Sequence, residues 1–222
     1  MTSERSYGQY CGLARALDLV GDRWAALVVR ELALGPLRFT DVLAGLPGVS
    51  TSVLASRLRR LERGGVVRRR VLPVPAASSV YELTDYGRDL VPVLLALGGW
   101  GARSLGARTP DQALRSHWLV LALKALFNPV AADGLELVSE VRLRDGPFRV
   151  AVGEGRIDVA RGSDPGAQLV FEADDDALVG LLAGALDLEV ARASGAVGLV
   201  AGEPADLECF LGLFRLAEPV AV

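Results

Sequence analysis

The residues best suited to chemistry in this sequence are serines and arginines that recur within one short segment, 50–64. If the segment is helical, successive residues turn by about 100°, which places Ser52, Ser56, Arg59 and Arg63 on one side. Guanidinium groups form paired hydrogen bonds with phosphates and with guanine edges, and hydroxyl groups also bond to bases. This side of the helix therefore has the chemistry that contact with a nucleic acid requires.

The same segment carries the signals of an amphipathic helix. Ser50 is a good N-cap, because its side-chain oxygen can accept a hydrogen bond from an unpaired amide at the helix start. Leu54, Leu58 and Leu61 recur at steps of four and three, so they form an apolar stripe that faces a core. A glycine pair that starts at Gly64 ends the helix, since glycine tolerates the left-handed turn often found there.

The neighbouring segments complete a known arrangement. Residues 38–41 open a short helix before it, and Gly48 lies in the turn between the two helices. Residues 66–71 and 79–83 are short β-rich runs separated by a turn. A surface helix with a solvated basic face would explain the arginines alone, but not these neighbours at these offsets. Together they predict a winged helix-turn-helix whose second helix lies in a DNA major groove.

Residues 10–101 resemble the HxlR family of bacterial winged-helix regulators. The matching sequences are CGLARALDLVGDRW with ALVVREL (11–32), LRFTDVLAGLPGVS (37–50), SRLRRLERGGVVRR (56–69) and YELTDYGRDLVPVLLALGGWG (81–101). The resemblance implies a transcriptional regulator that is a homodimer and binds an inverted-repeat operator in double-stranded DNA. Family members often carry an arginine at the wing tip, where this chain has Pro73 to Ser78 without one.

We expect contacts both to base edges and to phosphates. Ser52, Ser56 and Arg59 can reach base edges, whereas arginines on the flanks of the helix and on the first wing strand position the protein on phosphates. The expected DNA-binding residues are Arg38, Ser50, Thr51, Ser52, Ser56, Arg57, Arg59, Arg60, Arg63 and Arg68.

Charge divides the chain into two parts. Residues 1–109 contain 15 arginines and 9 acidic residues, a net charge of +6, whereas residues 110–222 carry −9. A basic part that meets phosphate, joined to an acidic part that does not, indicates two domains. The glycine-rich segment 98–108 is the expected boundary, which predicts domains over 1–103 and 109–222.

Helices near the wing carry more apolar side chains than a monomer of this kind can bury. In a helix over 11–20, Leu13, Ala16, Leu17 and Val20 form one stripe. A helix over 23–34, capped by Asp22, is expected to turn Trp24, Leu27, Val28 and Leu32 inward. A third helix, capped by Thr84, carries the residues of a predicted dimer surface: Val91, Leu94, Leu95, Leu97 and Trp100.

After Pro129 the pattern changes to short alternating runs separated by glycine-containing turns, which predicts an α+β domain with an antiparallel sheet. The predicted elements are strands over 135–143, 148–152, 156–160, 168–173 and 196–201, and helices over 110–127, 175–186 and 204–216. The fragments LVFEADDDALVGLLAGALDL (169–188) and SGAVGLVAGEPADLECFLGLF (194–214) resemble the sterol carrier protein-2 fold.

That resemblance implies an apolar tunnel between sheet and helices, and therefore a hydrophobic small molecule that modulates DNA binding. The residues expected to line it are Trp118, Leu121, Phe148, Phe171, Leu178, Leu182, Phe210 and Phe214. An alternative of another class is a lipid-binding carrier, although a carrier has no need of a recognition helix and wing.

A second alternative is a redox-sensing regulator that acts through Cys11, which aligns with a cysteine that some HxlR-like regulators use to sense quinones or oxidants. Accessibility and a lowered thiol pKa would favour this role, whereas burial would make Cys11 a small hydrophobic residue of the dimer interface. Cys209 is predicted to belong to the core.

Other classes are not expected. The two cysteines lie far apart and the chain has one histidine, so the sequence predicts no metal site and no cofactor. His117 has no suggested nucleophile or orienting partner, so we expect no enzyme. The acidic residues of 172–176 are expected to stabilise a helix start rather than to hold a metal. With no signal peptide and no apolar run near the ~20 residues of a membrane span, a cytoplasmic protein without a membrane partner is expected.

Overall fold

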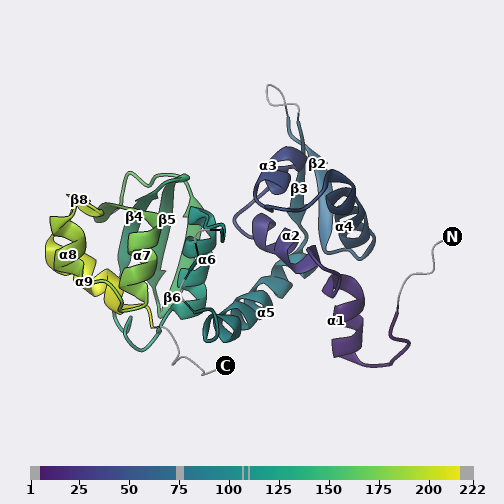
Figure 1. The fold of residues 1–222 in the computed structure, drawn as a ribbon, viewed down its shortest axis with the longest axis horizontal. Helices are drawn as coiled ribbons and strands as arrows, with labels where there is room; N and C mark the ends of the chain where they lie inside the picture. Colours follow the sequence, from purple (N-terminus) through teal and green to yellow (C-terminus); the bar gives the residue numbers. More distant parts are fainter. Residues whose placement is uncertain (1–5, 74–77, 107, 110, 216–222) are drawn as a thin grey trace. The chain divides into compact units, whose positions relative to one another are not determined.

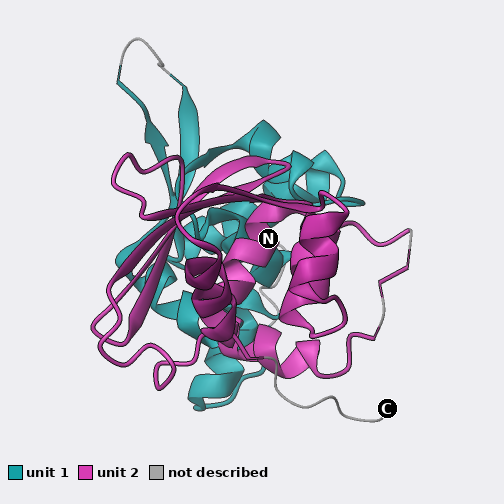
Figure 2. Ribbon diagram, turned by 90° about the vertical axis from the view of Figure 1, so that its left-hand side faces the viewer, with its two compact units in different colours: residues 1–94 teal, residues 95–222 magenta. Residues whose placement is uncertain are grey.

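The chain forms two compact units, Met1–Leu94 and Leu95–Val222, which Figure 2 distinguishes by colour. Each unit has its own sheet, three-stranded in the first and five-stranded in the second. The computed structural model describes residues 6–73, 78–106, 108–109 and 111–215.

Unit 1 combines helices with a small antiparallel sheet of order β1–β3–β2 (Figure 1). Its elements are α1 (Gly12–Val20), α2 (Ala25–Leu32), β1 (Leu37–Arg38), α3 (Phe39–Ala44), α4 (Thr51–Arg63), β2 (Val67–Val71), β3 (Ser79–Leu83) and α5 (Asp85–Ala102), which continues into the second unit. The succession of α3, a turn and α4 confirms the predicted helix-turn-helix, and the β2–β3 hairpin forms the wing. Of the predicted wing tip, 73–78, residues 74–77 lie outside the described residues.

The ends of α4 follow the predicted signals. The Oγ atom of Ser50 accepts a hydrogen bond from the backbone amide of Val53 at 3.3 Å. Gly64 follows the last helical residue, and Gly65 then adopts a φ of +71°, in the left-handed region. The signals of the local sequence therefore mark both ends of this helix.

The apolar stripe of α4 is buried, as predicted. Its three leucines belong to one core with residues of α2, α3, the hairpin and the adjoining loops. The buried members of this core are Val28, Val29, Leu32, Val42, Leu46, Leu54, Leu58, Leu61, Val66, Val67 and Leu83. Burying a leucine side chain stabilises a fold by about 1.5–3 kcal/mol. The three leucines therefore fix the rotation of α4 about its own axis.

Part of the predicted apolar stripe of α1 is exposed. The buried residues are Ala14 and Leu19, while Leu13 is 69% exposed and Leu17 is 40% exposed. Leu19 is drawn inward because it packs against Gly64, where an added Cβ would lie 2.7 Å from Leu19 Cδ2. The apolar stripe of α1 is therefore left for another surface.

The start of α2 also differs from the prediction. Trp24 is the N-cap residue, with a φ of 79°, and the helix begins at Ala25 rather than at Arg23. Asp22 does not cap it, because its carboxylate pairs with arginines of α4. Val28 and Leu32 are buried as expected, whereas Leu27 is exposed.

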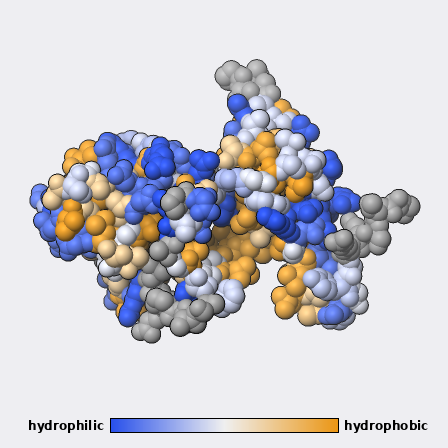
Figure 3. Space-filling model, in the orientation of Figure 1, coloured by the Kyte–Doolittle hydropathy of each residue, from blue (hydrophilic) through white to orange (hydrophobic). Residues whose placement is uncertain are grey.

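The dimer-surface residues predicted on α5 are divided between two environments. Thr84 caps this helix as expected, since its Oγ1 accepts a hydrogen bond from Gly87 N at 3.0 Å. Val91 and Leu94 pack against the core of unit 1, Leu95 is half-buried, and Leu97 and Trp100 are exposed. Figure 3 shows hydrophobic residues on the visible surface of α1 and α5.

Unit 2 is a five-stranded sheet of order β6–β5–β4–β7–β8 with helices packed on it, α6 and α7 in contact with each other (Figure 1). Its elements are α6 (Ser116–Leu126), β4 (Leu137–Leu143), β5 (Gly146–Gly153), β6 (Arg156–Arg161), β7 (Leu169–Ala173), α7 (Asp175–Leu182), α8 (Leu188–Ala193), β8 (Val197–Ala201) and α9 (Pro204–Gly212).

The sheet is mixed, which corrects the predicted antiparallel sheet. Strands β4, β5 and β6 form the expected antiparallel meander, but β7 returns to lie parallel to β4. Gln168 explains this placement: its backbone amide donates to Val138 O at 2.8 Å, and its Oε1 accepts from Val138 N at 2.7 Å. Alternation of residues predicts strands but not which strand each one joins.

Several helix bounds in unit 2 differ from those predicted. Helix α6 begins at Ser116, because Thr109 and Gln112 close a separate turn before it; the predicted start at Pro110 lies outside the described residues. Helix α7 ends at Leu182, before Gly184 with a φ of 66°. Helix α8 was not predicted, although Asp187 caps it.

Cys209 of the last helix, α9, does not belong to the core, contrary to the prediction. Leu207 and Phe210 of α9 are buried, three residues apart, and Cys209 is exposed. The predicted helix end at Leu216 lies outside the described residues. Among the helices of the described ranges, none combines the length and apolar character needed to cross a membrane.

One glycine of α5 should tolerate no side chain. A Cβ at Gly87 would lie 2.0 Å from Val66 O, the backbone at the start of the wing. Gly87→Ala should lower the free energy of unfolding by about 1–3 kcal/mol, measured by urea denaturation. Gly98→Ala in the same helix is the control, because a Cβ there meets nothing within 4 Å. Equal stability of the two variants would contradict the close approach.

Candidate nucleic-acid interface

One side of α4 is exposed and carries the predicted polar residues. Thr51, Ser52, Ser56, Arg59 and Arg63 are all exposed. Within the described residues the Arg59 side chain makes no hydrogen bond or ion pair, so its guanidinium N–H donors are available to a ligand. The arrangement is a polar, basic face opposite the buried leucines.

Two predicted DNA-binding residues also have local structural roles. Ser50 caps α4, and its Oγ lies 3.1 Å from Ser52 Oγ. Arg38 is exposed at the N-cap of α3, where its backbone amide donates to Asp41 Oδ2 at 3.2 Å. Contact of either side chain with DNA stays a prediction.

Arg57 and Arg60 hold α4 against the loop between α1 and α2. Arg60 Nη1 lies 2.7 Å from Asp22 Oδ2, and the same guanidinium donates to the backbone oxygen of Asp18. Arg57 Nε donates to Arg23 O at 2.9 Å, and its Nη1 lies 3.5 Å from Asp22 Oδ2. Both arginines are half-buried. These bonds hold α4 to the rest of the unit, and phosphate contact by these two residues stays a prediction.

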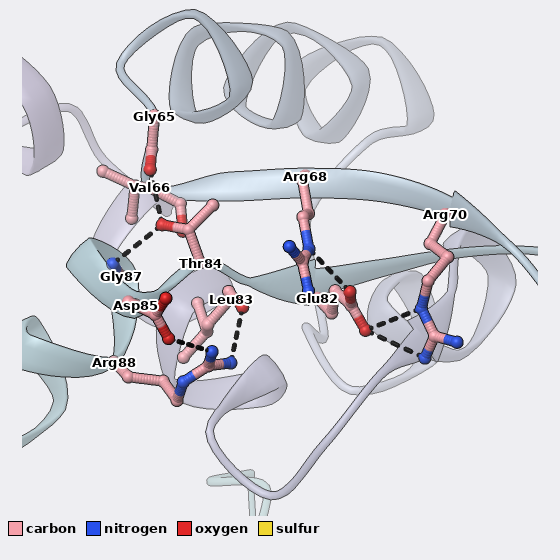
Figure 4. A network of polar contacts seen from close by, with 10 residues as sticks. All are labelled: Gly65, Val66, Arg68, Arg70, Glu82, Leu83, Thr84, Asp85, Gly87 and Arg88. Atoms are coloured by element: carbon pink, nitrogen blue, oxygen red, sulfur yellow. Dashed lines mark hydrogen bonds and ion pairs between the residues drawn. The ribbon is translucent and has the colours of Figure 1, made fainter.

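The wing strand carries a cluster that the sequence reasoning missed (Figure 4). Glu82 of β3 lies opposite Arg68 of β2, and Arg70 is two residues further along the same face. Glu82 Oε1 accepts from Arg68 Nε at 2.7 Å, and Oε2 is 3.0 Å from Arg70 Nε and 2.9 Å from Arg70 Nη2. The sequence did contain a signal for this cluster. An acidic residue lies in the strand that pairs with the strand of three successive arginines.

The ionisation of Glu82 is set by this cluster. Burial of the carboxyl would raise its pKa, but the hydrogen bonds and charges of Arg70 and Arg68 outweigh that effect and hold the pKa below its ordinary value of 4.5. At neutral pH Glu82 is therefore a carboxylate that partners both arginines.

The opposite face of β2 and the base of the wing are also fixed by hydrogen bonds. Arg69 Nη2 donates to Ser79 Oγ at 3.0 Å across the hairpin. Thr84 Oγ1 donates to Gly65 O at 2.5 Å, which joins the end of the wing to the end of α4 (Figure 4). The wing and α4 thus form one connected surface.

Comparison with known proteins agrees with this geometry. Residues 19–109 match the HxlR-like helix-turn-helix family. The chain is 42% identical over 86 residues to the uncharacterised transcriptional regulator YvaP of Bacillus subtilis, covering 39% of this chain and 80% of YvaP. It is 40% identical over 95 residues to the regulator sll1512 of Synechocystis, and the match covers 43% of this chain and 70% of sll1512. The chain belongs to the HxlR-like helix-turn-helix family.

Among solved structures, the reduced form of the regulator YodB from B. subtilis is 31% identical and matches 46% of this chain and all of YodB, with a TM-score of 0.39. The family assignment rests on sequence, and it covers the helix-turn-helix and wing of this HxlR-like protein.

The eight residues predicted to line an apolar chamber belong to unit 2. Six of them are buried, and Trp118 and Leu182 are half-buried. Phe171 meets Phe210 edge-on at 5.3 Å between ring centres, and Phe210 meets Phe214 at 5.1 Å. Three of the aromatic rings therefore pack on one another, and a chamber among these residues stays a prediction.

Asp175 and Asp176 lie in the first turn of α7, as expected, and acidic residues of 172–176 also pair with other segments. Asp175 is buried and accepts from Ser116 Oγ at 2.9 Å, while Asp176 binds Arg108 at 2.7 Å. Glu172 binds Arg142 at 3.3 Å. Asp174 is the N-cap residue of α7 but makes no capping hydrogen bond. The described part of the chain contains no group of three or more acidic, cysteine or histidine residues that could hold a metal.

Cys11 is exposed at the N-cap of α1, which excludes burial within this unit. The backbone amides of Ala14 and Leu13 lower the pKa of its thiol, although the thiol makes no capping hydrogen bond.

The cluster around Glu82 predicts a pH dependence. Because the pKa of Glu82 is lowered on folding, its contribution to stability is complete above 4.5 and is lost as pH falls through the folded value. At neutral pH, Glu82→Gln should therefore have a lower free energy of unfolding than the natural protein, measured by urea denaturation. This difference in free energy should shrink as the pH falls below 4.5. Glu62→Gln, which removes a carboxylate with no described partner, is the charge-matched control. A Glu82→Gln difference that is constant with pH would contradict the prediction.

Proposed function

We propose that this protein is a sequence-specific DNA-binding transcriptional regulator in which α4 enters the major groove and the β2–β3 wing contacts the backbone. The observation that carries the proposal is the exposed face of α4, with unpaired Arg59, opposite a buried leucine stripe. Membership of the HxlR-like family supports it, as do relatives named transcriptional regulators.

We further propose a cytoplasmic homodimer on an inverted-repeat operator. Support comes from exposed apolar residues on two helices of the winged-helix region, Leu13 and Leu17 of α1 and Leu97 and Trp100 of α5. A dimer would bury side chains that a monomer leaves in water. Two recognition helices about 34 Å apart would then meet half-sites one helical turn apart.

The two halves of the chain have different proposed roles. We assign 1–103 to DNA binding and dimerisation and 109–222 to an effector domain of sterol carrier protein-2 type that takes an apolar small molecule. The alternation of buried residues on one face of the sheet and the helices α6, α7 and α9 packed in this unit support such a fold. A ligand would change DNA affinity only if it binds one arrangement of the protein more tightly than another.

A second candidate, redox sensing through Cys11, is favoured by one observation: an exposed thiol whose pKa is lowered at a helix start. Cys209 offers a matched control, because it is also exposed and unbonded to another cysteine. A quinone should abolish operator binding by the natural protein and by Cys209→Ala but not by Cys11→Ala. If Cys11→Ala responds equally, Cys11 is not the sensor.

The DNA-binding proposal predicts a specific effect of Arg59. Arg59→Ala should weaken binding to a duplex selected from random sequences by about 1–3 kcal/mol, and should relax selectivity at one base position. Arg156→Ala removes the same charge from an exposed site in unit 2 and should leave selectivity unchanged. Fluorescence anisotropy with duplexes altered at each position measures both effects. If the two variants bind alike, α4 is not the recognition helix.

A further inference from the structure

The basic surface of unit 1 contains an acidic residue whose position calls for an explanation. The Glu82 side chain is 10% exposed, between Arg68 and Arg70, whose side chains are 60% and 45% exposed. A carboxylate at this place reduces the attraction of the wing to phosphate. If the wing contacts DNA, the carboxylate must provide something that offsets this loss.

The hydrogen bonds show what it provides. Arg68 uses its Nε toward Glu82, and Arg70 uses Nε and Nη2. Within the described residues, no other partner of either guanidinium group is found. Both terminal nitrogens of Arg68 and Nη1 of Arg70 therefore keep their donors for a ligand. One carboxylate holds two guanidinium groups side by side on the exposed face of β2 (Figure 4).

We propose that Glu82 is a positioning residue that orients Arg68 and Arg70 for hydrogen bonds with phosphate groups of the DNA backbone. The inference rests on the proposed function and names a part of the interface beyond the recognition helix. Glu82 itself does not contact DNA and acts through the two arginines.

The physical reason is the flexibility of arginine. A free arginine side chain samples many rotamers and loses that freedom when it binds a phosphate. Here the loss has already occurred on folding, since Glu82 is held in the middle of a paired strand and is ionised. The hairpin fixes the distance between the two guanidinium groups, because Arg68 and Arg70 are two residues apart on one face.

Charge alone makes the opposite prediction from positioning, which allows a direct test. Glu82→Gln removes a negative charge from a DNA-binding surface, so charge alone predicts tighter binding. Positioning predicts binding about tenfold weaker, because the neutral amide no longer holds both guanidinium groups. Glu62→Gln makes the same charge change on α4 without a described ion pair, and should bind as tightly as the natural protein or more tightly.

The experiment measures the affinity of each protein for one selected duplex over a range of salt concentrations. In an Arg68→Ala/Arg70→Ala background, Glu82→Gln should no longer weaken binding, because nothing remains to be oriented. That background should also reduce the slope of log affinity against log salt by about two, as expected for two lost phosphate contacts. A loss of the fold alone would not reproduce this dependence on the two arginines.

The outcomes separate the two levels of the account. Glu82→Gln that binds as tightly as Glu62→Gln overturns the positioning role. If Glu82→Gln does not fold, Arg70→Lys decides: it keeps the charge but loses the paired hydrogen bonds, so it should bind about threefold more weakly, and unchanged binding would overturn the role. If the natural protein binds no duplex, the proposed function itself fails.

Discussion

Burial of the leucine stripe of α4 is the constraint on which the functional surface depends. Three leucines at helical spacing can reach the core in only one rotation of the helix, and that rotation turns Ser56, Arg59 and Arg63 to solvent. Arg57 and Arg60 then fix the helix along its length, because both are bonded to the segment around Asp22. The polar face is thus a consequence of packing, and the arginines divide between holding the helix and facing outward.

In the wing, residues of β3 bind the arginines of β2. A row of arginines on β2 would repel itself if it stood alone, but Glu82 and Ser79 on β3 give each of them a partner. Thr84 bonds to Gly65 at the end of α4, which connects the base of the wing to that helix. Recognition helix and wing therefore present their donors as one surface of fixed geometry.

The sequence predicted the helix-turn-helix of unit 1 well because its signals are local. Ser50, the glycines after Arg63 and the spacing of the leucines each act within one helix, and all three predictions were confirmed. Features that depend on distant partners were missed, as with the pairing of Asp22 to Arg60 and of Glu82 to two arginines. In unit 2 the strands were predicted, but the parallel return of β7 depends on Gln168 bonding to Val138, thirty residues away. Strand pairing is not contained in the alternation of residues.

The central claim is that α4 lies against DNA, and local cleavage of DNA tests it most directly. In a protein without Cys11 and Cys209, an iron chelate attached to a cysteine at Glu62, one turn from Arg59, should cut a bound duplex at positions within the selected site. The same chelate at Val190, which is exposed on α8 of unit 2, should leave that site uncut. Cutting from Val190 but not from the α4 position, with both proteins bound, would contradict the account.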